Sequence, residues 1–72
     1  MTNGYNLRKI RTKNGYSQLD IANVLNTTQQ QYSKYETGTQ ELPARHILTL
    51  CRFYHVSADE LLGLVAPSED AE

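Results

Sequence analysis

The sequence is poor in the residues that cross-link small extracellular domains. Its 72 residues include one cysteine, Cys51, together with two prolines and no tryptophan. A lone cysteine excludes an intramolecular disulfide, so packing alone must hold the domain together. No apolar run reaches the roughly 18 residues of a membrane span, and residues 1–10 lack the apolar segment of a secretory signal. We therefore expect a cytoplasmic protein with no membrane segment.

The chain is also too short for a large catalytic α/β architecture, because a domain of this size buries only about 60% of the surface that its unfolded chain exposes. Hydrophobic residues make up 39% of the composition, which is ordinary for a globular domain and argues against wholesale disorder. We expect one domain over residues 1–65. Residues 66–72 are predicted to be an acidic, disordered tail, since they offer nothing apolar to bury.

Charge is spread unevenly, although the net charge is only −1. Positions 1–35 hold five of the seven basic residues and only one acid, Asp20. Positions 36–72 hold the other acids. The distribution of charge matters more than its sum for a nucleic-acid ligand, because phosphate is attracted to a local basic surface. One half of the chain is therefore basic.

Helix signals recur at short intervals, and no alternating run predicts a strand. Helices are expected over about 6–13, 17–25, 28–36, 43–55 and 57–63. Three of them start with a capping-box pattern, formed by Ser17 with Asp20, Thr28 with Gln31, and Ser57 with Glu60. Asn26 falls in the turn between the second and third helices, where asparagine tolerates a left-handed backbone. The pattern predicts an all-α domain of five short helices.

Apolar residues at helical spacing define the expected core. They are Leu7, Ile10, Leu19, Ala22, Leu25, Tyr32, Tyr35, Ile47, Leu48, Cys51, Tyr54 and Leu61, with Ile21 and Arg11 as further candidates. The short last helix cannot bury all of its apolar neighbours, which predicts a contact surface there. Those neighbours are Val56, Leu62, Leu64 and Val65.

The stretch from Gln18 to Glu36 has the spacing of a helix-turn-helix. This motif needs a small residue where the helices cross, a residue that permits the turn, and a bulky residue that packs back. Ala22, Asn26 and Tyr32 occupy these places. The spacing is more specific than any single residue in it.

The sequence resembles the Cro/repressor type of helix-turn-helix, or xenobiotic-response-element family, which includes the lambda-like phage repressors. The matching segments are residues 6–11, 15–22, 32–38 and 43–62, including the Tyr35-Glu36-Thr37-Gly38 ending of the third helix. The resemblance implies a compact, five-helix, lambda-repressor-like fold. It also implies a transcriptional regulator that binds double-stranded DNA sequence-specifically, and we expect this regulator to be a repressor. Two positions depart from the family: Asn26 replaces the usual Gly, and Tyr32 replaces the usual Ile or Val.

Candidate base-reading side chains lie near the start of the third helix, the end that enters the major groove in this geometry. They are Gln29, Gln30, Ser33 and Lys34. A Gln amide can bond two edge atoms of adenine, and a Lys can donate to guanine. Outside this framework, a solvated polar helix face would be the better interpretation.

Candidate contacts to the DNA backbone are Gln18, Arg11, Tyr16, Thr28 and Gln31. Gln18 starts the second helix, where the helix dipole favours phosphate, and the resemblance implies such a contact. Arg11 has a second predicted role, because the family pairs an Arg of the first helix with the Glu that ends the third, here Glu36. The alternative to this pair is two independent surface charges.

The loop over residues 37–42 carries Glu41 and no basic residue, which predicts a weak grip by one chain alone. We therefore expect a weak homodimer on a pseudo-palindromic operator, with the dimer surface near the last two helices, as the resemblance implies. The alternative is a module that binds a protein partner, such as an antitoxin, because one fold serves both uses.

Enzyme chemistry is not predicted, since no Gly-rich phosphate loop and no nucleophile-base pair occurs. Cys51 and His55 are one helical turn apart, but two ligands on one face are too few for a metal site. We expect no metal and no cofactor.

Overall fold

The computed structural model describes residues 6–63. It contains five helices, α1 (Leu7–Lys13), α2 (Gln18–Val24), α3 (Gln29–Thr37), α4 (Ala44–Tyr54) and α5 (Ala58–Leu61), and no strand in this range. The predicted all-α, five-helix fold is confirmed. The predicted acidic tail lies outside the described residues, as do Leu64 and Val65.

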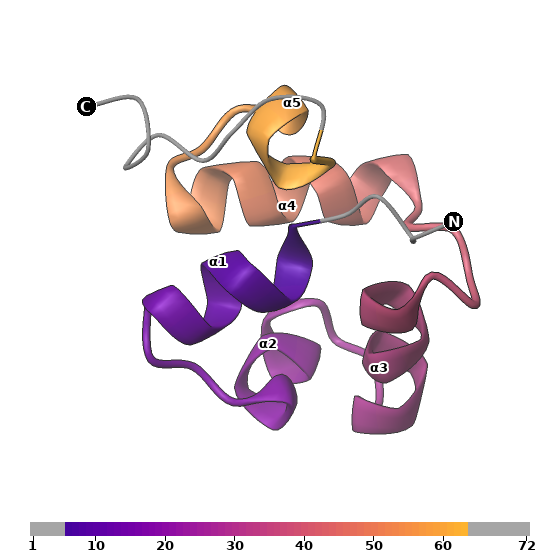
Figure 1. Ribbon diagram of the computed structural model, residues 1–72. Helices are drawn as coiled ribbons and strands as arrows, with labels where there is room; N and C mark the ends of the chain where they lie inside the picture. The colour runs from indigo at the N-terminus through magenta and orange to yellow at the C-terminus, as the bar shows by residue number, and fades with distance from the viewer. Residues whose placement is uncertain (1–5, 64–72) are drawn as a thin grey trace.

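The helices form two groups with α1 between them (Figure 1). α2 packs on α3, α5 packs on α4, and α1 also touches α3. Asn6 makes two hydrogen bonds to the end of the described chain. Its backbone N–H donates to Leu61 O at 3.0 Å, and its Nδ2 donates to Glu60 O at 2.8 Å. The start of α1 is thereby tied to the end of α5.

The turn between α2 and α3 has the predicted geometry. Asn26 has φ 59°, the left-handed conformation that asparagine tolerates better than most residues. At the far end of α2 from this turn, Ser17 and Asp20 form a complete capping box with bonds of 3.0 and 2.9 Å. On the α3 side of the turn, Thr28 Oγ1 accepts the Gln31 N–H at 3.1 Å. Local bonds thus set where α2 and α3 begin.

Helix phase decides which residues of α2 enter the core. Ile21, Ala22 and Leu25 are all buried, and they lie with the half-buried Gln18 on one face at intervals of three and four residues. The prediction that Leu19 is a core residue is wrong, since 51% of it is exposed. One position after Gln18, it points about 100° away from the buried stripe.

Helix phase overturns a second core prediction in α4. Leu50 is fully buried and His46 lies one turn before it, also buried. Leu48 precedes Leu50 by two positions and therefore points to the opposite side, where 58% of it is exposed. Ile47, Cys51 and Tyr54 are only partly buried against the core.

Within residues 6–63, the core comprises ten buried hydrophobic residues from the five helices, the end of α2 and the loop before α4. They are Leu7, Ile10, Ile21, Ala22, Leu25, Tyr32, Tyr35, Leu42, Leu50 and Leu61. The sequence prediction omitted Leu42, in that loop, and Leu50.

This core assignment can be tested with two leucines of one helix. Leu50→Ala should lower the free energy of unfolding by about 2–5 kcal/mol, because it leaves a cavity in the core. Leu48→Ala should change it by less than about 0.5 kcal/mol, because the side chain is exposed. Urea unfolding followed by circular dichroism measures both. Equal losses in the two variants would contradict this assignment.

Candidate functional site

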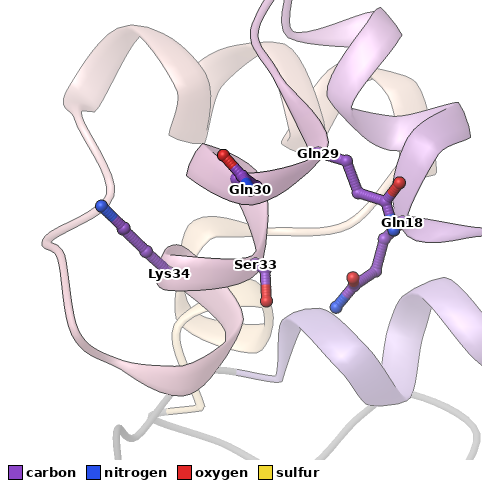
Figure 2. A pocket seen from close by; sticks show the side chains of 5 residues that line it. All are labelled: Gln18, Gln29, Gln30, Ser33 and Lys34. Carbon is purple, nitrogen blue, oxygen red and sulfur yellow. The ribbon is translucent and has the colours of Figure 1, made fainter.

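The start of α3 borders an open hollow of about 700 Å³ on the molecular surface. Its lining is polar. It consists of Gln18, Gln29, Gln30, Ser33 and Lys34 (Figure 2). The four residues predicted to read bases thus share one surface, and the fold adds Gln18 to them from the start of α2.

The orientation of these side chains follows from the packing of α3. One face of this helix buries Tyr32, Tyr35 and Glu36 against the rest of the domain. Of the lining residues of α3, Gln29, Gln30 and Lys34 are exposed and Ser33 is half-buried, and each lies within one helical turn of another. Gln29 is the first residue of the helix and Lys34 lies in its last turn, so the hollow runs along most of the helix.

The lining offers hydrogen bonds of both kinds and one positive charge. Its amides and hydroxyl can donate and accept, while the ammonium of Lys34 only donates. Figure 2 shows Gln29 directed toward Gln18 and Lys34 extending away from them at the other end. The hollow therefore suits a ligand with polar edges at one end and negative charge at the other.

Beneath the hollow, Arg11 and Glu36 form a bidentate ion pair. Arg11 Nε donates to Glu36 Oε2 at 2.6 Å, and Arg11 Nη2 donates to Oε1 at 3.2 Å. Arg11 Nη1 donates to Tyr16 O at 2.9 Å. Both residues are only 9% exposed. The pair thus joins α1, the loop before α2 and the end of α3.

Two further donors reach the same carboxylate. Tyr32 Oη donates to Glu36 Oε2 at 2.7 Å, and Gln18 Nε2 donates to Oε1 at 3.1 Å. Burial by itself would raise the pKa of Glu36, but the bonds from Arg11, Tyr32 and Gln18 outweigh it and hold the pKa below its ordinary value. Glu36 is therefore ionised at neutral pH, and both of its carboxylate oxygens accept hydrogen bonds.

The residues predicted to contact phosphate are placed differently from one another. Only Gln18 lines the hollow. The ring of Tyr16 packs against Phe53, with ring centroids 5.2 Å apart, although 38% of the residue is exposed. Thr28 is exposed at the helix start, and Gln31 Nε2 donates to Gln40 Oε1 at 3.0 Å. The buried, bonded guanidinium of Arg11 favours its role in the ion pair over a phosphate contact.

Sequence reasoning missed the bonds of Tyr32 and Gln18 to Glu36. A signal existed for the first, because Tyr32 and Glu36 are four residues apart and share a helix face. The second joins two helices and could not be read from spacing within either of them.

Residues 6–63 bring together no group of three or more His, Cys, Asp or Glu side chains able to hold a metal ion. Burial raises the pKa of the Cys51 thiol. In the same range, no helix has both the length and the hydropathy of a membrane span, and α4, the longest, has 11 residues.

Known proteins share this architecture. A family model described as helix-turn-helix matches residues 7–61. A crystal structure of a transcriptional regulator from Listeria innocua is similar with a TM-score of 0.77 at 28% identity, over 83% of this chain and 56% of that one. The chain belongs to the helix-turn-helix family, in agreement with the Cro/repressor resemblance of its sequence.

Curated relatives point to the same class of protein. The chain is 42% identical to the SPbeta prophage-derived uncharacterized HTH-type transcriptional regulator YonR of Bacillus subtilis, over 82% of this chain and 55% of that protein. It is 36% identical to the HTH-type transcriptional regulator ImmR of the same organism, over 88% and 50%. Antitoxin PezA of Streptococcus pneumoniae is 28% identical over 96% and 46%. The chain spans about half the length of these relatives.

The ion pair can be tested with a double-mutant cycle of Arg11→Met and Glu36→Gln. We expect a coupling free energy above the ~0.2–1 kcal/mol of exposed pairs, because the pair is bidentate and buried. Urea unfolding of the four proteins at neutral pH measures it. A coupling near zero would show that the two side chains do not interact.

The same proteins test how the free energy of unfolding changes at acid pH. Because the pKa of Glu36 is lowered by folding, its stabilisation is present above the pKa of an unfolded Glu, about 4.3, and is lost as pH falls through the folded value. Between these two pKa values, the stability of the wild type should therefore fall more steeply with falling pH than that of Glu36→Gln. Parallel curves would contradict a lowered pKa.

Proposed function

We propose that this chain binds double-stranded DNA sequence-specifically as a transcriptional regulator, with the start of α3 in the major groove. The observation that carries the proposal is the polar hollow along α3 in a member of the helix-turn-helix family. The mechanism is repression by occupancy of the operator, without catalysis, in the cytoplasm.

In this proposal, Gln29, Gln30, Ser33 and Lys34 read base edges. The amides of Gln29 and Gln30 suit the N6 and N7 atoms of adenine, and Lys34 suits guanine O6 and N7 or a nearby phosphate. Their common surface and outward direction support this assignment.

Backbone contacts come from residues around the two helix starts. Gln18 at the edge of the hollow is the strongest candidate, followed by Tyr16, Thr28 and Gln31. Arg11 contributes indirectly, because its ion pair holds α3 against α1.

The chain acts as a weak homodimer on a pseudo-palindromic operator. Two-fold symmetry would place the α3 helices about 34 Å apart, in successive major grooves. Val56 and Leu62 belong to the proposed dimer surface; both are half-buried, Val56 shortly after α4 and Leu62 directly after α5. The other two residues of that surface lie outside the described range.

A second candidate function is that of an antitoxin, which binds a protein partner. The relative named as an antitoxin aligns over 96% of this chain, and this favours the candidate. DNA binding and partner binding are compatible on this fold. Specific DNA binding by the isolated chain distinguishes a regulator from a module that only binds protein.

Selection from random duplexes, followed by footprinting at saturation, tests the proposal. We expect enrichment of one sequence with two related half-sites and a symmetric footprint. Absence of enrichment over random DNA would reject sequence-specific binding. One chain per duplex with an asymmetric footprint would reject the dimer alone.

Base reading by the two glutamines makes a sharper prediction. Gln29→Ala or Gln30→Ala should cost about 1–3 kcal/mol of binding free energy on the selected duplex and little on random DNA. Thr49→Ala, an exposed position of α4, is the matched control and should bind as the wild type does. Fluorescence anisotropy measures all four proteins. Equal losses on both DNAs would argue against base reading.

A further inference from the structure

Tyr32 is fully buried but carries a hydroxyl. A buried hydroxyl must find a partner, whereas an aliphatic side chain could fill the core without one. Tyr32 Oη finds Glu36 Oε2 at 2.7 Å, and the same oxygen accepts Arg11 Nε at 2.6 Å. The hydroxyl therefore acts on the Glu36 carboxylate in addition to the packing that the ring supplies.

The two oxygens of Glu36 face different partners. Oε2 accepts from Arg11 Nε and Tyr32 Oη, whereas Oε1 accepts from Gln18 Nε2 at 3.1 Å and from Arg11 Nη2 at 3.2 Å. A carboxylate is planar and rigid, so rotation about its bond to the side chain moves both oxygens together. Donors that hold Oε2 therefore also hold Oε1, the acceptor of the Gln18 bond.

Gln18 links this buried carboxylate to the surface. It is half-exposed and lines the hollow beside Gln29 (Figure 2). Because Nε2 points at Glu36, the amide is held in one of its two flipped orientations. The amide oxygen and the second N–H are not used by this bond, so a ligand in the hollow meets them already oriented.

We propose that Tyr32 is a positioning residue for DNA recognition: acting through Glu36, its hydroxyl orients the Gln18 amide at the edge of the hollow. This inference rests on the proposed function, since it takes DNA as the ligand of the hollow. The ring of Tyr32 fills the core and its hydroxyl sets the orientation, so Tyr32→Phe separates the two roles.

A binding cycle on the selected duplex tests the proposal. Tyr32→Phe should weaken binding about fivefold, and Gln18→Ala should weaken it at least as much. The double variant should bind as Gln18→Ala does, because the hydroxyl acts only through that amide. Losses that multiply in the double variant, or wild-type affinity of Tyr32→Phe, would overturn the proposal.

The control for this cycle is Tyr35→Phe. Tyr35 is a buried tyrosine of the same helix whose ring packs edge-on against Tyr32, with centroids 6.4 Å apart. The Tyr35→Phe variant should bind DNA as the wild type does. Circular dichroism at the assay temperature confirms that every variant is folded, so that a loss of affinity is not a loss of structure.

A second measurement needs no DNA and so separates this inference from the proposed function. In nuclear magnetic resonance spectra, the Gln18 Nε2 proton bonded to Glu36 should be protected from exchange in the wild type and in Tyr35→Phe, but not in Tyr32→Phe. Unchanged protection in Tyr32→Phe would overturn the proposal. A chain that shows the expected pattern but binds no DNA would overturn the proposed function and uphold the link from Tyr32 to Gln18.

Discussion

The buried carboxylate of Glu36 is the constraint on which the arrangement of α1, α2 and α3 depends. An unpaired charge at this depth would cost several kcal/mol, so its position is tolerated only if donors surround it. Arg11 supplies them from α1, Gln18 from α2 and Tyr32 from α3 itself. Because these donors are directional, they restrict the crossing of the three helices more narrowly than apolar contact alone would.

Under the proposed function, this arrangement links the stability of the domain to DNA recognition. The residues that satisfy Glu36 on the inner side belong to the scaffold, whereas Gln18 reaches the same carboxylate from the edge of the hollow. The Glu36 carboxylate therefore fixes the exposed face of α3 relative to the buried face. If the hollow is the proposed DNA-binding surface, its fixed position means that it loses little conformational entropy on binding, which favours specific contacts.

Much of the fold could be predicted from the sequence because its signals are local. The caps at Ser17 and Thr28 and the turn at Asn26 each involve residues within three or four positions of one another. Core membership was less predictable. Leu19 and Leu48 have the hydrophobicity of core residues, but each lies about 100–200° around its helix from the buried face, and only packing defines that face.

The candidate site, like the fold, was predicted from the sequence only in part. The sequence by itself determined the helices, the turn between α2 and α3, and the outward polar group of Gln29, Gln30, Ser33 and Lys34, because helical spacing relates neighbours along one chain segment. Only the tertiary structure decided that Gln18 joins that group and that Tyr32 shares the ion pair of Arg11 and Glu36. The physical reason is that hydrogen bonds between helices depend on the distance and direction between side chains that are remote in sequence, and only the tertiary arrangement of the helices sets both.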